Sequence, residues 1–139
     1  MKTYHLLAGC LFGCVLLLLP SCGTTGNSND KAKVEISPRL SEDKIRDEIF
    51  KYTPIGSTLV NVKEFARTRL KYVGPAPYED GPATRRHWPG PDEEIGVRSV
   101  GVCLGDYGFP GRIDTYIHWA FDQNDKLIDV VVEKERDSL

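Results

Sequence analysis

Side chains able to perform covalent or acid–base chemistry are scarce in this sequence of 139 residues, which has four cysteines and three histidines. Cys103 with His118 could supply a thiol nucleophile and its base, the pattern of a small hydrolase. His87 with Asp92 or Glu93 could do acid–base work. Because no further orienting group stands at a telling spacing from either pair, we expect no catalytic residues and no enzyme.

Both members of the first pair also have a plain structural explanation. Cys103 alternates with Ser99 and Gly101 in an expected strand, where it would be a small apolar residue on the outer sheet face. His118 would be a polar residue on the sheet face opposite Trp119. Metal binding needs three or four ligands at ordered spacings, which two scattered histidines and one cysteine do not supply. We therefore expect neither a metal nor a cofactor.

Recognition of a partner is better supported, by residues in two loops. The run "RRHW" at 85–88 places two guanidinium groups beside an indole, and arginine and tryptophan are residue types that anchor interfaces. Prolines around this run would reduce the entropy lost on binding. In the alternative interpretation the indole packs back on the sheet and the arginines are solvated. The candidate partner-binding residues are Arg85, Arg86, Trp88, Tyr107 and Phe109.

The start of the chain predicts where the protein is located. Residues 6–19 carry no charge and follow Lys2. A cation, then an apolar run of about 7–15 residues, then small residues is the layout of a secretory signal. As a helix this run would reach about 21 Å, short of a hydrocarbon core of about 30 Å. We expect residues 1–21 to be a signal peptide, with an uncleaved and poorly fitting anchor as the alternative.

The same segment resembles a bacterial lipoprotein signal, in which the cysteine of a lipobox is acylated. Both Leu7-Ala8-Gly9-Cys10 and Leu19-Pro20-Ser21-Cys22 match that pattern. Cleavage before Cys10 would leave an apolar segment too short to engage a bilayer, and Cys14 has the same fault. We therefore assign the lipid to Cys22. The resemblance implies fatty acyl chains, such as palmitate, that anchor this residue in a lipid bilayer.

The resemblance also indicates which membrane. Gly23 is not the aspartate that retains some lipoproteins in the inner membrane, which favours the outer membrane with the domain facing the periplasm. The formal net charge of −2 provides no basic field for nucleic acid. Residues 23–33 are small and polar and are expected to act as a flexible tether. We place the lipidated cysteine and linker at 22–37 and one small domain at 38–139.

Within that domain, apolar residues at helical spacing predict two helices, at about 41–52 and about 58–71. Residues 74–96 hold five of the nine prolines and are expected to form one long loop. Alternating apolar residues then predict strands at 97–104, 114–121 and 127–134. The expected fold class is α+β, with two N-terminal helices packed on a three-stranded antiparallel sheet.

This order of elements, behind a lipobox, is similar to the small SmpA/BamE-like lipoprotein domains, whose shape recurs in the β-lactamase inhibitory protein. The stretches "YTPIGSTLVNVKEFARTRL" (52–70) and "HWAFDQNDKLIDVVVEK" (118–134) carry the likeness. The family works in outer-membrane barrel assembly, so the resemblance implies a non-enzymatic domain that binds envelope proteins.

Three functions remain as hypotheses. The first is a membrane-anchored, non-enzymatic lipoprotein that binds a protein or another envelope component. The second is a periplasmic inhibitor or immunity protein of a secreted enzyme, which would insert a loop into an active-site cleft. The third, less favoured, is a hydrolase that uses Cys103 and His118.

Overall fold

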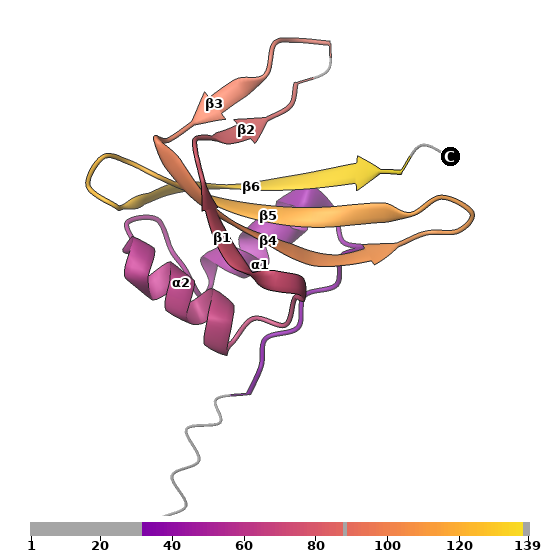
Figure 1. Ribbon diagram of the computed structural model, residues 1–139, viewed down its shortest axis with the longest axis horizontal. Coiled ribbons are helices and arrows are strands. Elements are labelled where there is room, and N and C mark those ends of the chain that lie inside the picture. The colour runs from indigo at the N-terminus through magenta and orange to yellow at the C-terminus, as the bar shows by residue number, and fades with distance from the viewer. Residues whose placement is uncertain (1–31, 88, 138–139) are drawn as a thin grey trace, which may run out of the picture.

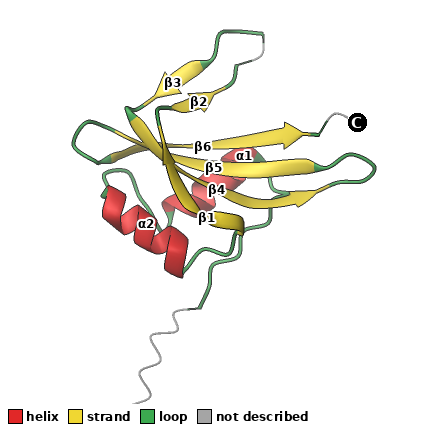
Figure 2. Ribbon diagram, viewed as in Figure 1, coloured by secondary structure: helices red, strands yellow, loops and turns green. Residues whose placement is uncertain are grey.

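The structure is a computed structural model that describes residues 32–87 and 89–137. In this part of the chain two helices precede six strands (Figures 1 and 2). In chain order the elements are α1 (Glu42–Phe50), α2 (Leu59–Thr68), β1 (Val73–Asp80), β2 (Ala83–Arg85), β3 (Glu93–Ile95), β4 (Arg98–Tyr107), β5 (Ile113–Phe121) and β6 (Leu127–Arg136).

The strands form two sheets. β1, β4, β5 and β6 make an antiparallel four-stranded sheet in the order β1-β4-β5-β6, and β2 and β3 make a separate two-stranded sheet. The predicted fold class, an α+β domain built on a three-stranded sheet, is therefore wrong. The described chain is mostly β, although its two helices and the strands β4, β5 and β6 lie where the sequence pattern placed them.

The error lies in residues 74–96, where one long loop was expected and β1, β2 and β3 are found instead. β1 has almost no buried side chains and contains Pro75 and Pro77, so it shows no apolar alternation. Proline is tolerated on an edge strand, and β1 is an edge. β2 and β3 are three residues long, too short for a periodic signal.

Both helices begin at hydroxyl caps. The Ser41 Oγ accepts a hydrogen bond from the Lys44 N–H (3.4 Å), and the Thr58 Oγ1 accepts one from the Asn61 N–H (3.2 Å). Both helices are shorter than predicted at their C-terminal ends. Their apolar residues point at the sheet, and the fully buried side chains in the two helices include Ile45, Ile49, Val62 and Ala66.

The core fills the space between the helices and one face of the sheet. That face carries the buried side chains of β4, β5 and β6, namely Val100, Val102, Leu104, Ile117, Trp119, Phe121, Val130 and Val132. The buried Trp119 Nε1–H donates to the Thr53 Oγ1 at 3.0 Å, which satisfies the one polar atom of the indole.

A bulge shifts the register of β6. Phe121 pairs with Leu127 but the preceding Ala120 pairs with Asp129, so one residue of β6 is left over. As a result Leu127 is buried, whereas Ile128, which strict alternation with Val130 and Val132 would place in the core, is 40% exposed. A pattern of strict period two cannot show such an insertion.

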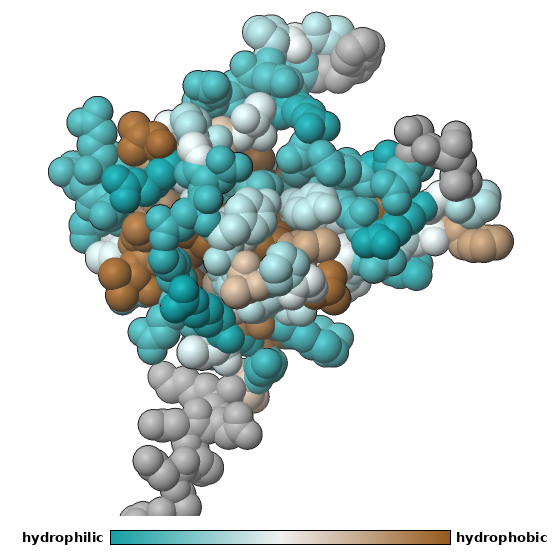
Figure 3. Space-filling view, in the orientation of Figure 1, coloured by the Kyte–Doolittle hydropathy of each residue, from teal (hydrophilic) through white to brown (hydrophobic). Residues whose placement is uncertain are grey.

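The opposite face of the sheet is partly covered by the hairpin β2–β3, which rises from the sheet beside β6 (Figure 1). Ala83 and Ile95 of the hairpin form a small apolar cluster with Ala120 and Val131 of the sheet. The Ser99 Oγ also donates to the Gly81 carbonyl at 3.0 Å. The hairpin is mainly hydrophilic on the face seen in Figure 3, and hydrophobic residues gather over the sheet and helices. The described molecule thus has three layers: helices, sheet and hairpin.

The segment that precedes α1 packs against the rest of the domain from Val34 onward. The Val34 N–H donates to the Arg69 carbonyl at 2.6 Å, and the Lys71 N–H donates to the Val34 carbonyl at 2.9 Å. Ile36 is buried in the core. Val34 and Ile36 fall within the expected linker 22–37, yet both pack against the domain. Neither described helix is long and apolar enough to span a bilayer.

Candidate binding groove along strand β6

β6 is one edge of the four-stranded sheet, and within residues 32–87 and 89–137 no further strand lies beside it. The Val130 N–H donates to the Asp129 Oδ1 at 2.7 Å, and a side chain therefore takes the place of a neighbouring strand. The Asp137 N–H, seven residues later, donates in the other direction to the Arg112 carbonyl beside β5 (3.0 Å). Because backbone groups alternate in direction along a strand, the amides of Val132 and Lys134 point outward as that of Val130 does.

A groove runs along this edge. The groove has a volume of about 320 Å³, and its floor is Val130–Val132. One wall is the start of α1, with Glu42, Asp43 and Arg46. The other wall is the end of β2 and the residues after it, Arg85–His87. A smaller hollow of about 110 Å³ continues it along Thr84, Glu133 and Lys134. We call this surface the β6 groove. It brings together segments of the chain that lie more than 80 residues apart.

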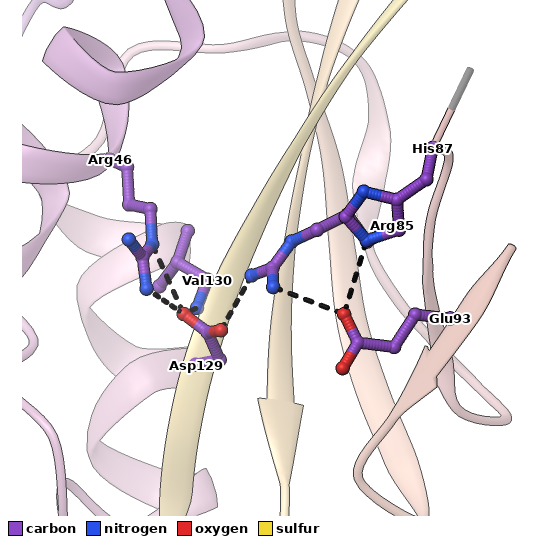
Figure 4. Close-up of polar contacts among 6 residues, drawn as sticks. All are labelled: Arg46, Arg85, His87, Glu93, Asp129 and Val130. Atoms are coloured by element: carbon purple, nitrogen blue, oxygen red, sulfur yellow. Dashed lines mark hydrogen bonds and ion pairs between the residues drawn. The ribbon is translucent and has the colours of Figure 1, made fainter. Parts of the chain in front are cut away.

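One end of the β6 groove is closed by an ion-pair cluster at Asp129 (Figure 4). Arg46, from α1, donates to the Asp129 Oδ1 through Nε (3.1 Å) and through a terminal nitrogen (2.5 Å). Arg85, from β2, donates to the Asp129 Oδ2 at 2.6 Å. The carboxylate therefore joins the helix and hairpin layers across the edge of the sheet. The Asp129 side chain is only 15% exposed, whereas the Arg46 and Arg85 side chains remain 39% and 33% exposed, so the carboxylate is the more shielded partner.

The same arginine holds the hairpin together. Arg85 also donates to the Glu93 Oε2 on β3 at 3.3 Å, and the His87 Nε2 lies 3.3 Å from that same oxygen (Figure 4). Of the two carboxylates considered with His87 as an acid–base pair, it is Glu93 that lies against the ring. It forms an exposed ring–carboxylate pair that supports the end of β2.

Arg86 lies on the opposite side of the hairpin end and reaches the outer face of β6. One of its terminal nitrogens is 2.8 Å from the Glu133 Oε1 and 3.4 Å from the Glu135 Oε1. The contact with Glu133 is an ion pair and not an aligned hydrogen bond. The Arg86 side chain is 63% exposed, so it lines the groove while remaining accessible to a partner.

Two carboxyl groups of β6, those of Asp129 and Glu133, have shifted pKa values. Burial alone would raise the pKa of Asp129, but the hydrogen bonds from Arg46, Arg85 and the Val130 N–H outweigh it and hold the pKa below the ordinary 3.8. Burial raises the pKa of Glu133 above its ordinary 4.5, and the nearby Arg86 guanidinium offsets this only in part. Asp129 is thus a firmly ionised anchor, whereas the charge of Glu133 is less well compensated.

The predicted partner-binding residues are brought together only in part. Arg85 and Arg86 both line the β6 groove. Tyr107 lies beyond its far end, where its hydroxyl accepts from the Lys134 Nζ at 3.2 Å. Phe109 lies at the tip of the β4–β5 loop and is 98% exposed. Trp88 and Cys22 lie outside the described residues.

Sequence reasoning missed Arg46, Asp129 and Glu133. Each belongs to an element whose pattern was recognised. Asp129 and Glu133 were read as outward residues of a strand, and Arg46 was not singled out. The only available signal was that Asp129 and Glu133 share the outward face of β6 with Val131 between them. An apolar residue on a face otherwise read as solvated indicates that something covers that face, which here is the hairpin.

The residues of the hydrolase hypothesis lie elsewhere, on the outer sheet face. Cys103 pairs with Tyr116 and His118 pairs with Gly101, so the thiol and the imidazole occupy diagonal positions on β4 and β5. Burial raises the pKa of Cys103 and lowers that of His118. A nucleophilic cysteine needs a lowered pKa. Cys103 lines a hollow of about 480 Å³ together with Tyr78, Arg112 and Tyr116.

Among the described residues no group of three or more His, Cys, Asp or Glu side chains is placed to hold a metal ion. No protein-family model, curated protein or solved structure matches this chain.

Proposed function

We propose that the protein is a non-enzymatic lipoprotein, anchored through acylated Cys22 on the periplasmic side of the outer membrane, whose domain binds a protein of the cell envelope in the β6 groove. The anchor is supported by the lipobox-like sequence that ends at Cys22. An anchor of this kind confines the domain to a thin layer and raises its effective concentration toward a partner in the same membrane.

The observation that carries the binding site is the placement of Arg85 and Arg86. These residues were selected from their types alone, and they lie on one wall of a groove whose floor is the free edge of a strand. The groove is pre-formed, since the Asp129 cluster fixes both walls against the sheet. A pre-formed site loses little conformational entropy when a partner binds.

Site-specific photocrosslinking tests the binding site. A photoreactive amino acid at position 84 replaces an exposed threonine that lines the groove and leaves both arginines in place. The matched control is the same group at position 60, where Val60 is 70% exposed on α2. We expect one envelope protein to be captured from position 84 and not from position 60. Equal capture from both positions, or from neither, would contradict the proposal.

The anchor is tested separately by Cys22→Ala. We expect the variant to leave the membrane fraction, because a single lipidated residue supplies the acyl chains. Mass spectrometry of the purified wild-type protein should find Cys22 as the first residue with added fatty acyl mass. A wild-type chain with another first residue, or a variant that stays with the membranes, would refute the assignment.

The inhibitor alternative is favoured by a different observation, the 98% exposed Phe109 at the tip of the β4–β5 loop. The loop tip is hydrophobic in Figure 3 as well. An exposed aromatic residue on a protruding loop suits insertion into a cleft of another protein. Under this alternative, Phe109→Ala would weaken inhibition of a secreted lytic enzyme, whereas Arg86→Ala would leave that inhibition unchanged.

A further inference from the structure

The two edges of the four-stranded sheet differ in how they are protected. β1 carries Pro75 and Pro77, which lack an N–H and blunt an edge against pairing. β6 contains no proline between Leu127 and Arg136. An edge strand without proline can accept an additional strand through its backbone groups. Of the two edges, β6 is therefore the one that remains competent for pairing.

Only part of the β6 edge is taken up internally. At Leu127 the backbone bonds to the loop before α2, through Gly56 N–H to the Leu127 carbonyl and Leu127 N–H to the Ser57 carbonyl, both at 2.8 Å. The Val130 N–H is occupied by Asp129. Beyond this point the outward N–H and C=O groups of Val132 and Lys134 have no backbone partner among the described residues. The free stretch coincides with the open part of the groove.

The walls of the groove limit what can reach this edge. α1 stands on one side of β6 and the β2–β3 hairpin on the other, and both line the same hollow. An extended segment needs less room between these walls than a folded domain does. A second copy of the protein would bring its own α1 and hairpin toward the first pair, which disfavours direct pairing of two β6 edges.

The charges of the walls indicate the side chains of the partner. On the hairpin wall Arg85 and Arg86 are neutralised within the domain by Asp129, Glu93, Glu133 and Glu135. On the helix wall Glu42 and Asp43 make no ion pair with any described residue. Lys134 also lines the groove without an ion pair to a described residue, and its Nζ donates to the Pro38 and Leu40 carbonyls. The two unpaired carboxylates of α1 outnumber this single ammonium, so the uncompensated charge of the groove is negative and lies on the α1 side.

From these observations we propose that the partner enters the β6 groove as an extended segment that adds a fifth strand beside Val132 and Lys134, with basic residues at alternate positions facing Glu42 and Asp43. This inference rests on the proposed function, since it describes how the partner binds in the same groove. Side chains of a strand alternate between its two faces, so every second residue of the segment faces α1.

Two N-methylated peptides test whether the backbone of the bound segment hydrogen-bonds to β6. The probe is a blocked Lys-Thr-Lys-Thr-Lys-Thr peptide, titrated into the full-length protein in detergent micelles. Along a strand the N–H direction alternates together with the side chains. N-methylation of all lysines, or of all threonines, therefore removes either the N–H groups that face β6 or those that face away. We expect one modified peptide to lose at least tenfold in affinity and the other to bind as the parent does. Equal affinity of the two modified peptides would overturn strand addition.

Charge variants test whether the basic side chains of the segment face Glu42 and Asp43 on α1. Glu42→Gln with Asp43→Asn should weaken the parent peptide about fivefold, the effect of losing two exposed ion pairs. The matched control removes the same charge elsewhere on the helices through Asp47→Asn with Glu64→Gln, both exposed positions, and should bind as the wild type does. Equal affinity of the two double variants would overturn the assignment of the basic residues to the α1 wall.

Other outcomes separate this inference from the proposed function. Capture of a partner from position 84, combined with equal binding of both N-methylated peptides, would reject strand addition and leave groove binding in place. No capture from position 84 would reject the proposed function itself. A concentration-dependent dimer that the parent peptide dissociates would identify a second copy as the occupant of the edge and overturn the inference.

Discussion

At the scale of single residues, Asp129 determines the geometry of the β6 groove. Its two oxygens accept from Arg46 on α1 and Arg85 on β2, and its Oδ1 also accepts the Val130 N–H. Removal of one partner from a shielded charge cluster leaves the others poorly compensated. Sequence patterns selected Arg85 as a candidate interface residue but could not supply its contact with Asp129, because the two positions lie 44 residues apart in the chain.

We expect Asp129→Asn to lower the free energy of unfolding by about 1–3 kcal/mol at neutral pH, the typical contribution of hydrogen bonds to a charged group. The lowered pKa of Asp129 means that its contribution is present above its ordinary pKa of 3.8 and is lost as the pH falls through the folded-state value. Denaturant unfolding of both proteins at pH 7 and near pH 3 measures this. A stability difference that stays constant between the two pH values would contradict the role of the ionised carboxylate.

A second residue-scale prediction concerns His118, which lies half-buried between Tyr78 and Tyr116 with its pKa lowered by burial. The neutral ring is favoured in the folded state, so its contribution is present above the ordinary pKa of 6.5 and is lost as the pH falls below it. We expect thermal stability to fall between pH 7 and pH 5, and His118→Gln to flatten this response. A His118→Gln slope equal to that of the wild type would refute the prediction.

At the scale of elements, the helices and β4 to β6 were predictable because each carries a clear apolar period. The strands β1 to β3 were not predictable, since β1 is exposed along nearly its whole length and β2 and β3 have three residues each. These strands exist because of contacts distant in sequence, such as the pairing of Tyr78 with Gly101. The groove depends on them, since β2 forms one of its walls.

The attachment of β1 can be tested at Gly101. A Cβ built there would lie 2.4 Å from the Tyr78 Cζ, so the tyrosine ring packs directly on the glycine. We expect Gly101→Ala to force the ring away and to destabilise the protein by about 1–3 kcal/mol. Gly101→Ala combined with Tyr78→Ala should recover part of the loss in denaturant unfolding, because the clash is removed. Equal destabilisation with and without the tyrosine would contradict this packing.

At the scale of the whole molecule, the three layers have different structural roles. The helices and the sheet enclose the core, while the hairpin covers the opposite sheet face and forms the second wall of the groove. The lipobox-like leader predicts the location, and the free edge of β6 supports the binding mode. Sequence alone predicts the anchor, and it selected two residues, Arg85 and Arg86, that line the groove. The groove itself arises from the meeting of α1, β2 and β6, which no local pattern encodes.

Amide hydrogen exchange of the full-length protein, with and without the blocked Lys-Thr hexapeptide, tests the central claim most directly. If the β6 edge is the binding site, exchange at Val132 and Lys134 slows on addition of the peptide, while exchange along β1 is unchanged. Unchanged rates at both β6 positions in the presence of bound peptide, or protection along β1 instead, would contradict the claim.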